Sequence, residues 1–271
     1  MDTLASDLLS HLGLQPEPPT RSFLTRVHRA FVTGVTYDTI GIHLGSPPPL
    51  DPEAAARRAL NGWVGYCFGM NGALSWLLRE LGFDITLHAA IVRRKSDTAD
   101  PGVNHVTLFV HFDDGDVLAD AGMGDGLLDP LPLEEGEYPQ EPFVFALRRR
   151  GSEWTFVHDA AGSFASMDIL GAPIEMSGVE DEHRFLSTSP NSAFVQALVL
   201  LRRRETGIDI LRSRTLYRTG ADGRSKHVLN GEAELREVFA EVFETSVTDE
   251  ELDVLWQRAC DQHEAFLASR R

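Results

Sequence analysis

The sequence predicts an α+β fold in three successive parts, and the change of pattern along the chain carries this prediction. Apolar residues recur at helical spacing through residues 1–83, whereas residues 84–186 hold short β-branched and aromatic segments separated by Gly, Asp and Pro turns. Residues 187–271 combine both patterns. We therefore expect a mostly helical first domain, a central antiparallel sheet or barrel, and a mixed α/β third domain, with boundaries at these positions.

Helix-start and helix-stop residues mark the elements of the first domain. An amphipathic helix is expected in LASDLLSHLGL, and Thr20 is expected to cap a second helix, RSFLTRVHRAFVTGV. The pair Asp51-Pro52 starts a third helix, because Asp favours the N-cap and Pro the first helical position. In the last helix, GMNGALSWLLRELG, the apolar residues share one stripe, and Gly82 suits the position just past its end.

Short segments of the second domain are expected to be strands. Their β-branched and aromatic residues and their turn-rich separators are typical of an antiparallel sheet or barrel. The segments are DITLHAAIVRR, HVTLFVHF, DVLADAG, FVFALRRR and WTFVHDA.

The third domain returns to helical periodicity, with strands between its helices. Helices are expected in NSAFVQALVLLRR, AELREVFAEVF and DEELDVLWQRACDQHEAFL. The segments IDILRSRTLYRTG and SKHVLN are expected to be strands.

Composition and charge restrict the class of protein. The 271 residues carry a formal net charge of −16 and a pI near 5.0, which disfavours nucleic acid as a partner. Two cysteines without a CxxC or a disulfide framework favour a reducing cytoplasm. No stretch approaches the ~20 apolar residues that span a bilayer, and the acidic N-terminus lacks the features of a signal peptide, so no membrane association is expected.

The ten histidines are candidates for metal ligands or catalytic bases. No HExxH motif or cysteine–histidine cluster is present, so no metal site is expected. His11 and His28 lie in helices of surface type and are expected to have no special role. The histidines of the β region are the remaining candidates for a base; they are His88, His105, His111 and His158.

Cys67, in the segment GYCFGMN, stands at the start of a helix. The positive end of the helix dipole favours a thiolate there, which makes Cys67 a candidate nucleophile. Helical spacing also puts Cys67 on the apolar line of Met70 and Leu74, and cysteine is among the most buried residue types, so a packing role is the alternative. The other cysteine, Cys260, lies in an acidic helix and is expected to be unreactive.

A thiolate nucleophile needs a base, and the base needs a group that orients it. The adjacent strands NHVTLFVHF and DVLADAG offer His105 or His111 together with Asp120, a carboxylate that is costly to bury without a partner. A two-residue turn at Asp114-Gly115 would put Asp120 opposite Phe109, on the face of His105 but ~13 Å from it. Contact with His105 then needs a wider loop. The residues nominate an imidazole–carboxylate pair and do not choose between the two histidines.

Five segments of the chain, in order and spacing, match the motifs of one family. GYCFGMN resembles a nucleophile segment RGGxCxExN, NHVTLFV a strand with a catalytic His, and LADAGMG a strand and loop with a catalytic Asp. VTYDTIGIHLGSPPPLD resembles an IPFENL…LG…LD stretch, and STSPNSAFVQALVLLRR a Pro-x-Ser-x-Phe helix entry. The chain thereby resembles the arylamine N-acetyltransferases over most of its length. The resemblance implies an N-terminal helical bundle, a central antiparallel β-barrel and a C-terminal α/β lid around a cysteine-protease-like core.

The resemblance also implies a catalytic triad of Cys67, His105 and Asp120. In that family the imidazole pairs with the thiolate, and the carboxylate holds the imidazole. Acetyl-CoA, as co-substrate, passes its acyl group to the sulfur, and an amine then takes it in a ping-pong reaction without a permanently bound cofactor. The backbone amide of Phe68 is expected to stabilise the oxyanion.

Two groups of residues are expected to contact substrates. Gly122, Met123 and Gly124 are expected to let the pantetheine or pyrophosphate of the donor approach the backbone, with a simple turn as the alternative. The acceptor pocket is expected to be formed by Tyr37, Phe68 and Met123.

Departures from the family pattern concern the acceptor side more than the chemistry. Trp63 and Val64 replace the Arg and first Gly of RGG, and Gly69 replaces the Glu that would pair with that Arg, so no charge is left unpaired. Tyr37 and Met123 stand where the family has Phe. Two other functions therefore remain open: amide or macrolactam synthesis from an acyl chain on CoA or an acyl carrier protein, and thiol hydrolysis of the papain or transglutaminase type. For acyl transfer from acetyl-CoA, the expected acceptor is a small-molecule amine.

Overall fold

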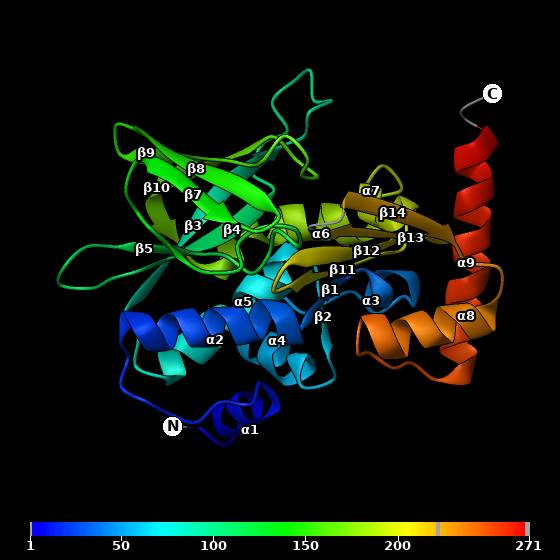
Figure 1. The fold of residues 1–271 in the computed structure, drawn as a ribbon, viewed down its shortest axis with the longest axis horizontal. Coiled ribbons are helices and arrows are strands. Elements are labelled where there is room, and N and C mark those ends of the chain that lie inside the picture. The colour runs from blue at the N-terminus through cyan, green and yellow to red at the C-terminus, as the bar shows by residue number, and fades with distance from the viewer. Residues whose placement is uncertain (1, 221–222, 269–271) are drawn as a thin grey trace.

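The computed structural model describes residues 2–220 and 223–268, and the helices of its first third lie together on one side of the molecule (Figure 1). Thr20 and Asp51 cap their helices as predicted, by accepting from the N–H groups of Phe23 and Ala54, and Gly82 follows the last helix with a φ of +83°. No helix within the described residues combines the length and apolarity of a bilayer-crossing segment. These first helices are α1 (Thr3–His11), α2 (Arg21–Gly34), α3 (Ile40–His43), α4 (Pro52–Ala59) and α5 (Cys67–Glu80).

An antiparallel sheet of eight strands forms a nearly closed barrel next to these helices (Figure 1). The strand order is β6-β5-β4-β3-β10-β9-β8-β7, so the hairpin of β4 and β5 lies towards one end of the sheet. The strands are β3 (Ile85–Arg93), β4 (His105–Val110), β5 (Val117–Ala119), β6 (Leu131–Pro132), β7 (Gly136–Gln140), β8 (Phe143–Arg150), β9 (Glu153–Val157) and β10 (Ser166–Ile174). A short 3-10 turn, η1 (Met176–Val179), and α6 (Glu180–Thr188) follow the barrel.

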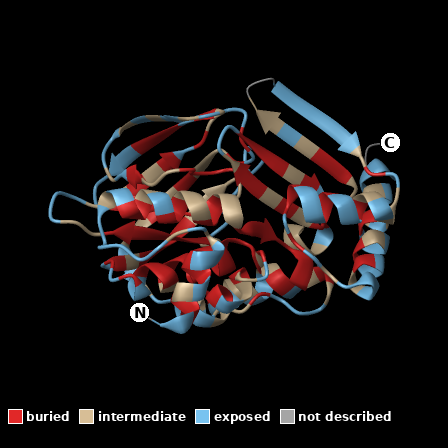
Figure 2. Ribbon diagram, turned by 60° about the horizontal axis from the view of Figure 1, so that its bottom comes forward, coloured by how far each residue is buried: buried red, intermediate tan, exposed pale blue. Residues whose placement is uncertain are grey.

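A second sheet joins the two ends of the chain. Its order is β14-β13-β12-β11-β1-β2, so β1 (Thr36–Asp38) and β2 (Trp63–Gly65) of the first domain extend a C-terminal meander. The meander consists of β11 (Val199–Arg204), β12 (Gly207–Arg212), β13 (Thr215–Gly220) and β14 (Gly223–Val228). The sequence suggested neither β1 nor β2, because three residues are too few for a periodic pattern. Figure 2 shows the outer strand β14 as the exposed edge of this sheet.

The C-terminal helices lie at the far end of the molecule from the barrel (Figure 1). They are α8 (Glu232–Glu237), continued by the π-helical turn η2 (Val238–Val242), and α9 (Asp249–Ala268), close to the predicted ranges. Their apolar faces form one core with Leu198, Leu200 and Leu211 of the meander.

One predicted element is wrong. The segment NSAFVQALVLLRR was expected to be a helix, but it contains only the short helix α7 (Ala193–Gln196) before the chain extends into β11. A continuous apolar run is compatible with either structure, and pairing with β1 and β12 decides for the strand. Arg202 and Arg203 are buried in this strand because their guanidinium groups donate to backbone carbonyls, among them those of Thr33 and Gly207.

The predicted fold class is confirmed: helices, then an antiparallel barrel, then a mixed α/β region. The two faces of β4 pack against different cores. Val106, Leu108 and Val110 pack into the core shared with the helices, whereas Phe109 packs inside the barrel. His105, four residues before Phe109, is on the same face of the strand as Phe109.

Candidate active site

Cys67 is the first residue of α5, and only Tyr66 separates it from the strand β2. The turn between them is fixed by Asp38, whose buried carboxylate accepts from the N–H groups of Ile40 (2.8 Å) and Gly65 (2.7 Å). Gly65 has a φ of +106°, and Pro48 packs where a side chain would start, so glycine is required at this position. The sulfur is therefore held at a helix N-terminus, 4% exposed, with the Cys67 thiol 3.7 Å from the Asn104 carbonyl oxygen.

The hairpin of β4 and β5 has a wider loop than a two-residue turn. Phe109 pairs with Leu118 and Val110 with Val117, so the residues between the strands are 111–116. This register brings Asp120 two positions closer to His105 along the ladder than the tight turn would. The distance between His105 Nε2 and Asp120 Oδ2 is 2.8 Å.

His111, the alternative base, belongs to a different pair. Its Nδ1 lies 2.8 Å from Asp116 Oδ1, and its Nε2 lies 2.9 Å from the hydroxyl of Thr86. The structure therefore brings together Cys67, His105 and Asp120 and leaves His111 at the other end of the hairpin.

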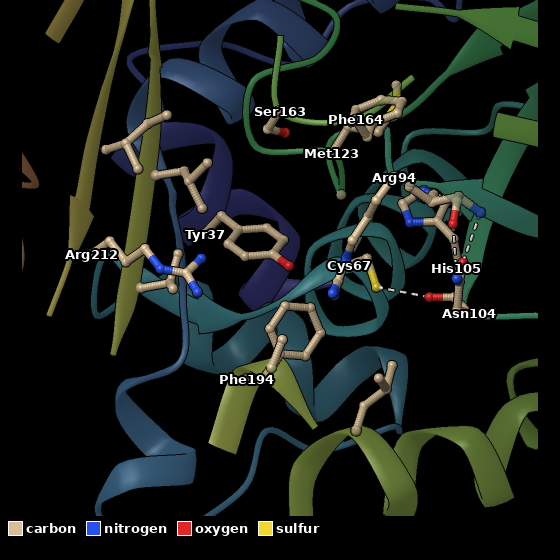
Figure 3. Close-up of a pocket in the computed structure, with 17 residues that line it drawn as sticks. Tyr37, Cys67, Arg94, Asn104, His105, Met123, Ser163, Phe164, Phe194 and Arg212 are labelled. Carbon is tan, nitrogen blue, oxygen red and sulfur yellow. Dashed lines mark hydrogen bonds between the residues drawn. The ribbon is translucent and has the colours of Figure 1, made fainter. Parts of the chain in front are cut away.

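The two nitrogens of His105 have different partners. Nε2 contacts Asp120, which leaves Nδ1 as the nitrogen available to the sulfur of Cys67. Figure 3 shows Cys67 and His105 on the same wall of a cavity. An imidazole in this position can exchange a proton with the sulfur while the carboxylate fixes the ring.

Electrostatics favour an ion pair between His105 and Asp120. Burial alone lowers the pKa of His105, but the Asp120 charge, its hydrogen bond and Cys67 together outweigh burial and raise that pKa to about 10. Burial raises the pKa of Asp120, but His105 and the hydrogen bond from Asn71 bring it below its usual range. At neutral pH the imidazole is thus an imidazolium, the charge state that stabilises a thiolate beside it.

Asn71, which sequence reasoning did not single out, and the backbone of Gly122 hold Asp120 in place. The Asn71 side chain, from the second turn of α5, donates to Asp120 Oδ1 (2.9 Å) and accepts from the N–H of Ala121 (2.8 Å). The N–H of Gly122 donates to the same carboxylate oxygen (2.8 Å). A Cβ on Gly122 would lie 2.7 Å from Asn71 Nδ2 and 2.9 Å from Cys67 Cα, so this glycine lets the loop pack against Cys67.

The expectation that His28 has no special role is wrong. Its side chain is fully buried, and its Nε2 accepts from the backbone N–H of Asp120 (3.2 Å). Its Nδ1 lies 3.0 Å from the Leu128 carbonyl, which can only accept, so Nδ1 carries the ring proton and the imidazole is neutral. Burial also lowers the pKa of His28. Buried Leu24 and Phe31, at i−4 and i+3 on the same helix face, are the sequence signal that could have found it.

A cavity of about 360 Å³ opens onto Cys67 and His105, and residues of all three parts of the chain line it (Figure 3). Its wall is mostly apolar and aromatic, with Phe164 from the barrel side and Phe194 and Leu201 from the C-terminal part. A cysteine beside a histidine on the wall of such a cavity is typical of a site for a small organic substrate.

Only some of the residues predicted to contact substrates line the cavity. Tyr37, Gly122 and Met123 line the cavity. Phe68 does not line it, because its fully buried ring packs against the rings of Tyr66 and His183, at 5.8 and 6.1 Å between centroids. Gly124 is outside the cavity too and has a φ of +70°, so a turn is the reason for glycine there. The Phe68 backbone amide remains in the first turn of α5, where amides have no partner within the helix.

The rate at which iodoacetamide alkylates Cys67 tests which histidine, His105 or His111, acts as its base. Because the pKa of His105 is raised to about 10, the imidazolium persists through pH 7–9, and the wild-type rate should be flat there. His105→Gln should react roughly 30-fold more slowly at pH 7, since an ordinary thiol is only a few per cent ionised, and its rate should climb with pH. His111→Gln is the matched control and should keep the flat profile. The reverse result, in which His111→Gln changes the pH profile and His105→Gln does not, would show that His111 and not His105 is the base.

Within residues 2–220 and 223–268, no group of three or more His, Cys, Asp or Glu side chains is arranged to hold a metal ion.

Comparison with known proteins gives one consistent result. A family profile described as N-acetyltransferase matches residues 22–252. The Arylamine N-acetyltransferase of Mycolicibacterium smegmatis is 30% identical over 235 residues, covering 80% of this chain and 85% of that protein. Arylamine N-acetyltransferase 1 of Bos taurus is 31% identical, but this match spans only about half of each protein, 48% of this chain and 47% of the bovine one. The solved structure of Mycobacterium marinum arylamine N-acetyltransferase in complex with CoA has the same fold, with a TM-score of 0.85, 23% identity, and coverage of 94% of this chain and 98% of that one.

Proposed function

The chain belongs to the arylamine N-acetyltransferase family, a family of transferases, and from this we propose that it moves an acyl group from a CoA thioester to an amine through a thioester on Cys67. The observation that carries the proposal is the buried His105–Asp120 ion pair, with 2.8 Å between Nε2 and Oδ2, beside a cysteine that lines a cavity. A packing cysteine needs neither the pair nor the cavity.

In the first half-reaction the Cys67 thiolate attacks the thioester carbon of the donor. The new bond joins that carbon to the cysteine sulfur, the bond to the CoA sulfur breaks, and the His105 imidazolium gives its proton to the departing CoA thiolate. The oxygen of the tetrahedral intermediate is negative, and the free amides in the first turn of α5, that of Phe68 included, are suited to stabilise it.

In the second half-reaction an amine attacks the carbonyl carbon of the Cys67 thioester. A carbon–nitrogen bond forms, the carbon–sulfur bond breaks, and neutral His105 takes the proton from the amine. The ion pair with Asp120 is then restored. One thioester exchange and one amide formation thus return the site to its starting state.

A CoA thioester is the donor we propose, because a relative of the same fold is solved in complex with CoA. Gly122 and Met123, which line the cavity next to Cys67, are suited to meet the pantetheine arm. Both cysteines are free thiols, which is consistent with a reducing compartment such as the cytoplasm.

Intact mass spectrometry after incubation with acetyl-CoA and other acyl-CoAs tests this proposal. The expected result is a mass increment of one acyl group that maps to Cys67 and disappears when an arylamine is added, with the amide as product. Cys260→Ala is the matched control and should acylate like the wild type.

Other outcomes point to other functions. No acylation of Cys67 by any acyl-CoA would contradict the proposed donor, and acylation only from a carrier-bound chain would favour amide synthesis in a biosynthetic pathway. Rapid acetyl-CoA hydrolysis without an amine would indicate a thiol hydrolase.

A further inference from the structure

The backbone of Asp120 lies just beyond the end of a strand. The ladder pairs of β5 end at Ala119 on the side of β4 and at Leu118 on the side of β6, so the N–H of Asp120 needs an acceptor from elsewhere. Asp120 is 1% exposed, and a buried N–H without an acceptor is costly. A side chain of α2 supplies that acceptor, because Nε2 of His28 lies 3.2 Å from the Asp120 nitrogen.

The same imidazole holds the far end of the loop that follows. Residues 120–130 connect β5 with β6. Nδ1 of His28 donates to the Leu128 carbonyl at 3.0 Å, and the next residue of α2, Arg29, donates to the Asp129 carboxylate at 2.9 Å. Two adjacent side chains of α2 thus fix both ends of this loop.

Only one protonation state of His28 satisfies both of its contacts. The N–H of Asp120 can only donate and the carbonyl of Leu128 can only accept, so Nε2 has a free lone pair and Nδ1 carries the proton. Burial, the largest influence, lowers the pKa of His28 and outweighs the nearby charges of Asp120 and Asp129, which raise it. His28 is therefore held neutral next to a carboxylate.

The neutrality of His28 matters because His105 depends on the same carboxylate. Burial lowers the pKa of His105, but the Asp120 charge and its hydrogen bond raise that pKa to about 10. A cation bound to Asp120 would repel the charge on His105 and lower its pKa. His28 instead contacts the backbone of Asp120 through a lone pair. It can fix the position of Asp120 without weakening the ion pair with His105.

We propose that His28 is a positioning residue of the site, whose neutral imidazole holds the backbone of Asp120 so that the carboxylate meets His105. The inference rests on the proposed acyl transfer, in which this ion pair activates Cys67. The contact between Nε2 and the Asp120 N–H carries the role, and the contact between Nδ1 and Leu128 fixes the tautomer that the first contact requires.

Two substitutions separate the two contacts of the ring. The amide of His28→Gln extends as far from the backbone as Nε2 and can offer its oxygen to the Asp120 N–H. The amide of His28→Asn extends only as far as Nδ1 and can serve Leu128 but not Asp120. The two variants are matched, because each replaces the buried ring by an amide and keeps one of its two hydrogen bonds.

The pH profile of Cys67 alkylation by iodoacetamide and the kcat for an arylamine with acetyl-CoA measure the effect. His28→Gln should keep the flat alkylation profile of the wild type and stay within about 3-fold of its kcat. His28→Asn should lower kcat by about 10-fold and make the alkylation rate climb with pH. An unpaired buried donor disfavours its position by about 10-fold or more, so Asp120 would move away from His105.

Thermal unfolding separates positioning from packing. Both variants shorten a fully buried side chain, so both should lower Tm. If His28 only packs, both will lose stability and both will keep the flat profile, and this result would overturn the inference. A changed profile in His28→Gln with an unchanged profile in His28→Asn would also overturn it, because the contact with Leu128 would then be the important one.

The wild-type protein provides a test that does not depend on the folding of the variants. Nitrogen NMR of protein labelled with ¹⁵N in its histidine rings should show His28 with a protonated Nδ1 and an unprotonated Nε2 at neutral pH. An imidazolium, or a proton on Nε2, would contradict the inference, because neither form can accept from the Asp120 N–H.

The inference and the proposed function can fail separately, because alkylation of Cys67 needs no acyl donor. If intact mass shows acetylation of wild-type Cys67 and the two His28 variants have the same profile and kcat, acyl transfer stands and the role of His28 fails. If no acyl-CoA acetylates the wild type and only His28→Asn loses the flat profile, acyl transfer fails and His28 remains the residue that positions Asp120.

Discussion

Cys67→Ala is expected to lower the rate of amide formation by about 10⁴-fold or more while the protein remains folded. In the proposed mechanism the Cys67 sulfur is the atom that carries the acyl group between donor and acceptor. The substitution removes one atom from a cavity wall, so it creates little new empty space in the core. Turnover of an arylamine with acetyl-CoA measures the first effect, and thermal unfolding followed by circular dichroism measures the second.

Cys260→Ala provides the control for general effects of losing a thiol. Cys260 is half-buried in α9, far along the chain from the site, and its replacement should leave turnover near that of the wild type. Near-wild-type turnover in Cys67→Ala would remove the thioester from the mechanism.

Asp120→Asn is expected to lower kcat by roughly 10³- to 10⁴-fold through the position of one proton. Asn71 and the Gly122 N–H both donate to Oδ1 of Asp120, so the amide oxygen of an asparagine must occupy that place. Its NH₂ group then faces His105 Nε2 and donates to it. The ring proton must therefore sit on Nδ1, the nitrogen that faces the sulfur, and the imidazole can no longer accept the proton of the thiol.

The pH profile distinguishes this effect from unfolding. The Asp120 charge is the largest favourable contribution to the raised pKa of His105, so its loss should move the alkylation profile of Cys67 towards that of an ordinary thiol. Asp116→Asn is the matched control, since Asp116 pairs with His111 at 2.8 Å in the same hairpin. It should keep both the turnover and the flat profile. An active Asp120→Asn with an unchanged profile would mean that the carboxylate does not orient the base.

The part of the fold that depends on local patterns could be predicted from the sequence. Thr20, Asp51 and Gly82 mark helix ends through caps that use only neighbouring residues, and the structure has them as expected. Five of the eight barrel strands follow from β-branched segments between turns, whereas β6, β7 and β10 were not among the predicted segments. The prediction of a helix around Val199 was wrong because the apolar residues there are compatible with both a helix and a strand. Only the long-range pairing with β1 decides for the strand.

Whether the candidate site could be predicted from the sequence depended on the length of one loop, the loop between β4 and β5. The types of residue nominated a cysteine, a histidine and a carboxylate, but an Asp-Gly pair also favours a two-residue turn, which would separate His105 from Asp120. The family resemblance selected His105, and the wider loop brings it within 2.8 Å of Asp120. That Arg94, directly after β3, and Arg212, the last residue of β12, line one cavity could not be foreseen, because no local pattern encodes the relative position of the two sheets.

The mixed sheet has a consequence for protein engineering. Backbone pairing ties Tyr37 to Leu201 and Asp38 to Leu200, and Tyr37 in turn to Gly65, two residues before the nucleophile. A chimaera that exchanges only the last third of the chain with a homologue would thus leave the pairing between β1 and β11 mismatched. Transplanting acceptor preference between relatives calls for moving residues 36–38 and 63–65 together with the meander as a single cassette.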